Sequence, residues 1–321
     1  MTRYFVAGGA GFIGSHLVHR LLQDPNSGIT IFDNFSSGRE WHLEQASGDA
    51  RLHVIRADIK DMPTLTEAMR QHDFVFHFAS NPDIARAVQE PGIDFWEGTY
   101  LTHNILEAMR VNGIKYLIYA SGSGVYGDTG TFPVFENYSP MLPISTYGAS
   151  KLAGEALICS YSHMFDISAS AFRFANVVGP RQTHGVAYDF VRRLLHDPTE
   201  LKILGDGTQS KSYIHVDDVV EAMCFIAGSN SDGFDYFNVA TEDYVTVREI
   251  ADLVVRMLEL QGVRYIFTGG DRGWRGDVPV VRFNTEKIRS RGWRNGRTSV
   301  EALRHSIESI INDARKGRFE N

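Results

Sequence analysis

The sequence predicts an α/β fold: a doubly wound parallel sheet with helices on both faces, joined to a smaller C-terminal α/β region. Short β-rich runs alternate with segments of helical length through the first half of the chain. Most of these runs are apolar nearly throughout, as in strands that are buried on both faces. Strands of this kind that alternate with helices form a parallel sheet covered on both sides.

Six runs have the composition of strands of this sheet. They are residues 4–8 (YFVAG), 29–33 (ITIFD), 52–58 (LHVIRAD), 73–79 (DFVFHFA), 116–121 (YLIYAS) and 167–173 (ISASAFR). The segments between them, such as GTYLTHNILEAMRVNG and YGASKLAGEALICSYSHMF, show the apolar recurrence of helices.

The rhythm changes after about residue 176, where longer loops rich in Gly, Pro and Asp begin. Helices are predicted near 186–196, 217–228, 246–260 and 298–315. We therefore expect a first domain at 1–175 and a second at 176–321, with a later strand and helix able to return to the first.

The composition restricts the partners that are expected. A net charge of -7 over 321 residues gives no general affinity for nucleic acid or anionic membrane. The two cysteines, Cys159 and Cys224, lie in apolar helical stretches, as in proteins of a reducing compartment. No apolar run approaches the roughly 18 residues of a membrane span. We expect a cytoplasmic protein, and no metal site, because His16 and His19 have no third ligand nearby.

The turn after the first strand carries the pattern G-x-x-G-x-x-G and leads directly into a helix. Glycines allow the tight turn and a close approach of the backbone to a diphosphate, whose charge the helix N-terminus favours. This context predicts a Rossmann-like dinucleotide site. Its residues would be Gly8, Gly11, Phe12, Ile13 and Gly14.

Asp33 ends the second strand, where a carboxylate accepts hydrogen bonds from both adenosine-ribose hydroxyls and repels a 2′-phosphate. This selects NAD over NADP. The other predicted NAD contacts lie at the carboxyl ends of neighbouring strands, although Asp58 is equally well explained as a turn or cap residue. They are Asn34, Ser37, Gly38, Asp58, Ile59, Phe78, Ala79 and Ser80.

Tyr147 and Lys151 in STYGASK are four residues apart, so in a helix both side chains lie on one face. A phenol is a poor base at neutral pH, but a nearby ammonium and a positive nicotinamide favour the phenolate. The pair therefore predicts a proton acceptor beside a hydride acceptor.

With these motifs the chain resembles the extended short-chain dehydrogenase/reductase family, and within it the nucleotide-sugar epimerases. The resemblance covers nearly the whole chain and rests on a series of motifs in family order. They are GGAGFIGSHL, DNFSSG, FHFAS, VYGD, YGASK, RFANVVGPRQ, GDGTQSKSYIHVDDVV and GWRGDV.

The resemblance implies tightly held NAD that is reduced and reoxidised within each turnover. Tyr147 would take the proton of a sugar hydroxyl while hydride leaves the sugar carbon, usually C4. Lys151 would bind the nicotinamide ribose and lower the pKa of Tyr147. It also implies a homodimer built from the helices near 94–111 and 147–165.

One position breaks the family pattern. Gly122 stands where these enzymes carry the Ser or Thr that hydrogen-bonds the reacting hydroxyl, and Gly124 also replaces a common hydroxyl residue. Three explanations stay open. Ser121 or Ser123 takes over through a loop shift that glycine permits; Tyr147 acts alone, with a loss of rate; or the protein binds NAD and sugar nucleotide without useful turnover.

Two further departures concern specificity. A 4,6-dehydratase resembling this family would carry Asp and Glu after the Thr, whereas Ser123 and Gly124 occupy those positions here. Gly98 stands where relatives often have Asn, which indicates either a larger sugar pocket or a register shifted by one.

For the sugar nucleotide, the resemblance implies binding through the C-terminal region. Lys211 replaces the Arg that relatives use on the diphosphate, and lysine lacks the bidentate fork of arginine. Asn176 would meet the diphosphate, although an Asn that caps a loop is an equal alternative. The complete set of predicted substrate contacts is Asn176, Val186, Lys211, Arg272, Arg275 and Asp277.

The sequence thus predicts an NAD-dependent nucleotide-sugar epimerase, of the UDP-glucose/UDP-galactose 4-epimerase type, that acts through a 4-keto intermediate. The alternatives are a binding protein with lost or altered turnover, or a nucleotide-sugar reductase or dehydratase. UDP-sugar is the expected partner, and nucleic acid and membrane are not.

Overall fold

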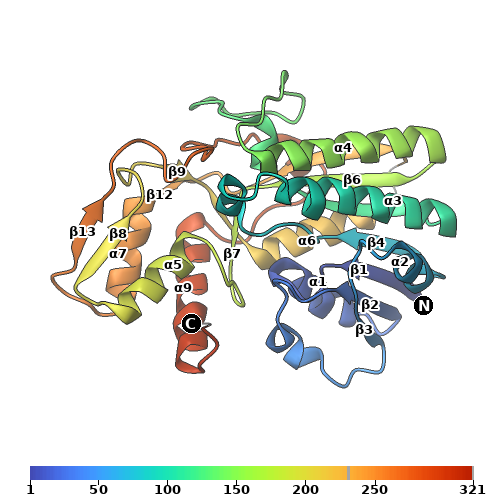
Figure 1. Cartoon of the computed structure of the whole chain (residues 1–321), viewed down its shortest axis with the longest axis horizontal. Helices are drawn as coiled ribbons and strands as arrows, with labels where there is room; N and C mark the ends of the chain where they lie inside the picture. The colour runs from blue at the N-terminus through green and yellow to red at the C-terminus, as the bar shows by residue number, and fades with distance from the viewer. Residues whose placement is uncertain (230–231, 320–321) are drawn as a thin grey trace. The chain divides into compact units, whose positions relative to one another are not determined.

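The computed structural model describes residues 1–229 and 232–319. The chain forms two compact units (Figure 1). The first contains Met1–Val125, Thr146–Arg173 and Val220–Phe237. The second contains Tyr126–Ser145, Phe174–Val219 and the chain from Asn238 onward.

The centre of the first unit is a seven-stranded sheet in the order β11-β6-β5-β4-β1-β2-β3. Parallel pairing joins β1 to β2 and β4, β2 to β3, and β4 to β5. The strands are β1 (Thr2–Ala7), β2 (Ser27–Asp33), β3 (Leu52–Arg56), β4 (Phe74–His77), β5 (Tyr116–Gly122), β6 (Ser168–Phe174) and β11 (Phe234–Val239).

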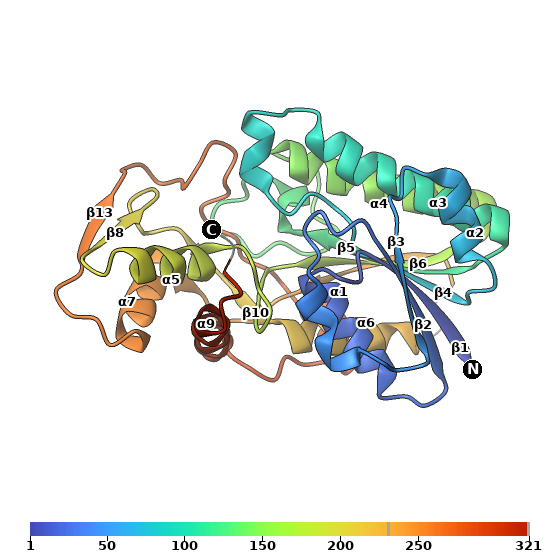
Figure 2. The ribbon, with the colours of Figure 1, turned by 60° about the horizontal axis from the view of Figure 1, so that its bottom comes forward.

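Helices cover both faces of this sheet, which confirms the predicted doubly wound fold. Figure 2 shows α3 and α4 on one face and α1 and α6 on the other. The helices are α1 (Phe12–Leu22), α2 (Met62–Met69), α3 (Tyr100–Asn112), α4 (Thr146–Phe165) and α6 (Val216–Ala227). Short segments complete the unit: η1 (Glu40–Ala46), η2 (Ile84–Val88), the π-helical η3 (Phe95–Thr99) and η4 (Ser123–Tyr126).

The strand order places a switch point between β1 and β4. From β1 the chain adds β2 and β3 on one side, and β4, β5 and β6 follow on the other. In open sheets of this kind, ligands bind at the carboxyl ends of the strands beside such a switch. The turns after β1, β2 and β4 are therefore the place to look for the cofactor site.

The second unit, in the described residues, combines helices with three two-stranded sheets. The pairs are β7 (Asn176–Val178) with β10 (Tyr213–His215), β9 (Ser210–Lys211) with β12 (Val245–Thr246), and β8 (Glu200–Ile203) with β13 (Arg264–Phe267). Its helices are α5 (Val186–His196), α7 (Val247–Met257), α8 (Glu286–Ser290) and α9 (Ser299–Arg315).

Local sequence explains where two of these helices begin. Thr246 caps α7 and Thr298 caps α9, each in a reciprocal capping box with a glutamate three residues later. Apolar residues of α5, α7 and α9 then form the core of the second unit. Among the described residues, no helix is both long and apolar enough to cross a membrane.

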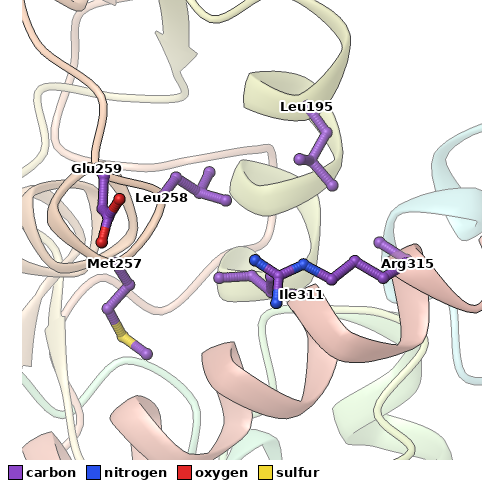
Figure 3. A pocket seen from close by; sticks show the side chains of 7 residues that line it. Leu195, Met257, Leu258, Glu259, Ile311 and Arg315 are labelled. Carbon is purple, nitrogen blue, oxygen red and sulfur yellow. The ribbon is translucent and has the colours of Figure 1, made fainter.

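A cavity of about 420 Å³ lies among α5, α7 and α9 of the second unit (Figure 3). Its lining is mostly aliphatic, with one carboxylate, Glu259, and one guanidinium, Arg315. Among the described residues that line this cavity, none is predicted from the sequence to act in catalysis or to bind NAD or substrate. This cavity is therefore not the candidate active site.

Candidate active site

The glycines after β1 are required by close packing. Gly8 has φ +80°, and a Cβ atom there would lie 2.7 Å from the Ala79 nitrogen. A Cβ atom on Gly14 would lie 2.3 Å from the carbonyl oxygen of Gly8. Gly11 is the N-cap of α1 and contributes no side-chain cap, so the N–H groups of Phe12 and Ile13 stay available to an anion. This turn suits the diphosphate of a dinucleotide.

Asp33 is buried at the end of β2 and already holds two backbone groups. Its carboxylate accepts hydrogen bonds from the Ala10 N–H (2.9 Å) and the Phe35 N–H (2.8 Å). Burial raises the pKa of Asp33, while these two hydrogen bonds act in the opposite direction and lower it. A Cβ atom on Gly38 would lie 2.9 Å from Asp33 Oδ1, so the loop after β2 folds back over the carboxylate.

Asp58 lies beside this loop and has a turn role of its own. It accepts from the Asn34 side chain at 3.1 Å and from the Lys60 N–H at 2.9 Å, and the adjacent Ile59 is buried. Ser37 is half-buried in the same loop.

The turn after β4 completes the edge where β1 and β4 meet. The N–H groups of Phe78 and Ala79 both donate to the Ala7 carbonyl, at 2.9 and 3.2 Å. Ser80 follows and is half-buried. The turns after β1 and β4 thus meet at the contact of Gly8 with Ala79.

Tyr147 and Lys151 lie in the first turns of α4, as the spacing predicts. The Lys151 ammonium is buried, donates to the Ala120 carbonyl at 2.8 Å, and lies 5.6 Å from the Tyr147 ring centre. Burial lowers the pKa of Lys151 to about 8. Burial, with a smaller contribution from Asp94, raises the pKa of Tyr147 to about 12. In the protein alone the pKa of Tyr147 therefore lies above its ordinary value, not below it as the sequence predicts.

Asp94 is a residue of this site that sequence reasoning missed. It is 1% exposed, and its carboxylate accepts from Asn81 Nδ2 (2.8 Å) and Thr146 Oγ1 (2.7 Å). Its carbonyl oxygen accepts from Ser150 Oγ at 2.6 Å. In the sequence an Asp before two aromatic residues looks like an ordinary helix cap, so no local signal distinguishes it.

The turn after β5 shows what the missing hydroxyl leaves behind. Apart from its chain neighbours, no described heavy atom lies within 4 Å of a Cβ atom built on Gly122. Gly124, in contrast, approaches the backbone of α4, where its Cβ would lie 3.2 Å from Gly148 Cα. A side chain therefore fits at position 122 and is resisted at position 124.

The serines on either side of Gly122, at the end of β5 and the start of η4, have different surroundings. Ser121 is buried and its hydroxyl donates to Glu155 at 2.6 Å. Glu155 is in turn paired with Arg173 at 2.6 Å in the interior. Ser123 is half-buried in η4. Ser121 is thus engaged in a structural network, while Ser123 is the more accessible hydroxyl.

Gly98 lies in η3 against α4. A Cβ atom there would come within 2.3 Å of Ser150 Oγ, so the close approach of α4 accounts for the glycine. The sequence leaves two interpretations of Gly98, an enlarged sugar pocket or a shifted register. This contact gives a packing reason for the glycine and does not indicate an enlarged pocket.

Three of the predicted substrate residues come together in the second unit. Lys211 Nζ is paired with Asp277 Oδ1 at 2.7 Å, and Arg272 donates to the Asp277 carbonyl at 2.6 Å. Arg272 also pairs with Asp128 at 2.5 Å, a partner that sequence reasoning missed. Asp277 is buried and orders this basic cluster, which we define as Lys211, Arg272 and Asp277.

The remaining predicted substrate residues lie on other elements of this unit. Asn176 begins β7, and its N–H donates to the carbonyl of Ser212, the residue after Lys211. Val186 begins α5 behind Gly185, which adds no side-chain cap. Arg275 is exposed. In residues 1–229 and 232–319, no three His, Cys, Asp or Glu side chains are grouped as a metal ion would require.

Comparison with known proteins identifies the class. The model of the NAD dependent epimerase/dehydratase family matches residues 4–240, and the chain belongs to this family. It is 37% identical over 255 residues to UDP-glucose 4-epimerase of Mycolicibacterium smegmatis, covering 77% of this chain and 80% of that protein. A crystal structure of UDP-galactose 4-epimerase is 36% identical, with a TM-score of 0.86 over 97% of this chain and 99% of the other.

Relatives with other activities are nearly as similar. A UDP-N-acetyl-alpha-D-glucosaminuronate decarboxylase of Bacillus cytotoxicus is 32% identical over 259 residues, 78% of each chain. The family, its NAD dependence and its nucleotide-sugar chemistry are therefore established for this chain, and the substrate is a separate question.

Proposed function

We propose that this protein is an NAD-dependent 4-epimerase of UDP-hexoses that interconverts UDP-glucose and UDP-galactose. The observation that carries the proposal is the pairing of Tyr147 with Lys151 on one face of α4, beside a turn with no acid or base for elimination. The similarity to 4-epimerases supports it.

The residues present suit NAD at the switch point of the sheet. The glycine turn and the N-terminus of α1 would hold the diphosphate, and Asp33 the adenosine ribose. When bound, NAD supplies a reversible acceptor for the hydride of the sugar C4.

The role of Tyr147 is to take the proton of the C4 hydroxyl through its phenol oxygen and to return it after the 4-keto sugar has turned over. With a pKa of about 12 in the protein alone, the phenol needs additional positive charge to act near neutral pH. Lys151 supplies part of it, because a pKa of about 8 leaves the ammonium mostly charged at pH 7. The remainder would come from the positive nicotinamide ring.

The turn after β5 favours epimerisation over elimination. A dehydratase needs an acid and a base to remove water, and Ser123 and Gly124 supply neither in those positions. Because Ser121 already donates to Glu155, Ser123 is our candidate for a hydroxyl that assists proton transfer. If Ser123 does not assist, Tyr147 carries out the proton transfer alone.

We assign the sugar-nucleotide diphosphate to the basic cluster of the second unit. The Asp277 carboxylate pairs with Lys211, its carbonyl accepts from Arg272, and Asp128 pairs with Arg272, so both basic side chains are held in place with part of their charge compensated. Arg275, the third predicted cation, is exposed and could complete the contact. Lysine at 211 binds phosphate as a point charge, so we expect the diphosphate to be held less directionally than by arginine.

We also propose a homodimer formed through η3, α3 and α4. These elements lie side by side in the first unit (Figure 1). They leave large apolar side chains exposed: Trp96 is 53%, Val111 61% and Met164 70% exposed. Large exposed apolar side chains on neighbouring elements favour association.

A second candidate function has its own observation. Gly122 lacks the hydroxyl that would assist proton transfer, and the open space beside it is not filled by another described side chain. The chain would then bind NAD and a sugar nucleotide without useful turnover, as a binding or regulatory protein.

The test is product analysis by NMR after incubation with NAD and each of UDP-glucose, UDP-galactose, their N-acetyl forms and UDP-glucuronate. We expect one C4 pair to interconvert without accumulation of NADH; steady NADH formation would instead indicate a dehydrogenase. Tyr147→Phe should lower kcat by about 10²–10⁴-fold, as for loss of a general base.

The matched control is Tyr265→Phe, which removes a phenol oxygen that bonds Asp252 in the second unit. It should leave kcat unchanged. Undiminished activity in Tyr147→Phe would reject the mechanism. Binding of NAD and UDP-sugar without any product would favour the second candidate.

A further inference from the structure

Asp94 is a buried carboxylate whose hydrogen bonds join three segments around the predicted catalytic pair. It accepts from Asn81, beyond the end of β4, and from Thr146, the first residue of α4. Its own carbonyl accepts from Ser150, one turn further along α4. Tyr147 and Lys151 follow Thr146 and Ser150 directly in the sequence, so these bonds fix the turn that carries the pair.

The charge of Asp94 is also unusual. The carboxylate accepts its hydrogen bonds from an amide and a hydroxyl, both neutral, and the residue is 1% exposed. A buried carboxylate without a directly bonded cation acts on ionisable groups farther away, because little solvent screens it. The nearby groups that titrate are Tyr147 and Lys151.

We propose, resting on the proposed function, that Asp94 is a positioning residue of the Tyr147–Lys151 pair. Its hydrogen bonds to Asn81, Thr146 and Ser150 orient the first turn of α4 and hold its carboxylate beside the residues that carry the pair.

The two effects of this charge have opposite consequences for the pair. A negative charge raises the pKa of Lys151, against the burial that lowers it, and this keeps the ammonium charged at neutral pH. The same charge raises the pKa of Tyr147 and so opposes the phenolate. The Asp94 charge thereby makes Tyr147 depend more strongly on positive charge beside it.

Other groups around Lys151 must be considered in any titration. Glu155, one turn further along α4, also raises its pKa but is itself paired with Arg173. The ring of Tyr119 in β5 lies 5.1 Å from the ammonium, and the buried His77 of β4 has its pKa lowered to about 3, so it is neutral. Among the described residues of this set, Asp94 is thus the carboxylate that accepts from neutral donors and has no ion-pair partner.

Two substitutions separate the charge from the hydrogen bonds. Asp94→Asn removes the charge, while the new amide can still accept from Asn81 with its oxygen and donate to Thr146. Thr146→Val keeps the charge and removes the bond from α4 to the carboxylate, whereas the Ser150 bond to the Asp94 carbonyl remains; Thr146→Ser restores the hydroxyl. Glu67→Gln is the charge control, because it removes one exposed carboxylate, paired with Arg70 in α2.

The first measurement needs neither substrate nor turnover. The chain has seven lysines, so ¹³C-labelled lysine side chains can be titrated by NMR, with Lys151 assigned from its signal loss in Lys151→Met. We expect Asp94→Asn to lower the Lys151 midpoint below its starting value of about 8. Glu67→Gln and Thr146→Val should leave it in place.

The second measurement concerns orientation. We expect Thr146→Val to lower kcat by roughly 10-fold to 10²-fold with little change in KM, as for a misplaced catalytic group, and Thr146→Ser to recover most of it. In Asp94→Asn, the acid limb of the kcat/KM profile should move to lower pH, because the Tyr147 phenolate becomes easier to form.

An unchanged Lys151 midpoint in Asp94→Asn would overturn the charge role, whether or not the protein epimerises any sugar. Full kcat in Thr146→Val would overturn the orienting role, and this test remains if Asp94→Asn does not fold. Failure of the proposed function has a different signature, namely no product from the unmodified protein while the Lys151 midpoint still responds to Asp94→Asn.

Discussion

Two glycine-rich turns of the first unit follow strands of the same sheet, but their glycines have different physical origins. In the turn after β1, Gly8 needs a positive φ and Gly14 approaches a backbone oxygen at a distance no side chain tolerates. In the turn after β5, Gly122 is surrounded by open space. The backbone requires glycine at positions 8 and 14, whereas position 122 has room for a larger side chain.

This difference matters because glycine looks the same in both stretches of the sequence. A glycine required by packing identifies a place where the chain, and then a ligand, comes close to the backbone. Gly122 stands in open space without a positive φ, so neither packing nor backbone conformation requires a glycine there. The distinction can be tested by adding side-chain atoms to each turn.

The largest effect is expected from Gly14→Ala. Its methyl group would meet the Gly8 carbonyl oxygen at 2.3 Å, and neither backbone segment can move without disturbing β1 or α1. We expect the free energy of unfolding to fall by about 3 kcal/mol, the upper end for overpacking. NAD affinity, measured by calorimetry on the folded fraction, should fall at least about tenfold, since the turn that would hold the diphosphate must open. Unchanged NAD affinity would show that this turn does not bind the cofactor.

A smaller effect is expected from Ser121→Ala, which tests whether the turn after β5 has a structural serine. Its hydroxyl donates to the buried Glu155, so its loss should lower the free energy of unfolding by about 1.5–3 kcal/mol, as for bonds to charged groups. Thermal or urea unfolding gives this value.

Ser123→Ala is the matched variant in the same turn. Its side chain is half-buried, and we expect it to change stability by less than about 0.5 kcal/mol. If instead Ser121→Ala were stable and inactive while Ser123→Ala kept full kcat, Ser121 would be the substitute hydroxyl and our assignment would be wrong.

The sequence predicts the sheet well because its strands are dictated by local composition. All six predicted strands and the four later helices occur, with ends shifted by a few residues. The strand predicted at 52–58 ends at Arg56, because Asp58 instead receives the Lys60 N–H in a turn. A later strand is expected from the sequence to be able to return to the first domain, but its identity as β11 and its place beside β6 could not be predicted, since they depend on a long-range pairing rather than on a local pattern.

The candidate site was predictable where short-range rules apply. The spacing of Tyr147 and Lys151 and the glycines after β1 follow from helix and turn geometry. The residues that contact these groups could not be predicted from such local rules. Asp94 lies 53 positions before Tyr147, and Asp128 lies far from Arg272, so only the fold brings each pair of regions together.

The smallest effect on stability, and the sharpest test of the comparison, is expected from Gly122→Ser. With no described atom within 4 Å of the new Cβ beyond its neighbours, the free energy of unfolding should stay within about 0.5 kcal/mol. If the missing hydroxyl limits the rate, the same change should raise kcat, since an acid/base partner typically contributes about 10²-fold or more to the rate. Gly124→Ser is the contrasting variant: its Cβ would press on Gly148 beside Tyr147 and should lower both stability and kcat. A Gly122→Ser variant that is stable but no faster would mean that the hydroxyl missing at position 122 does not limit the rate, either because Ser123 replaces it or because Tyr147 works without a hydroxyl partner.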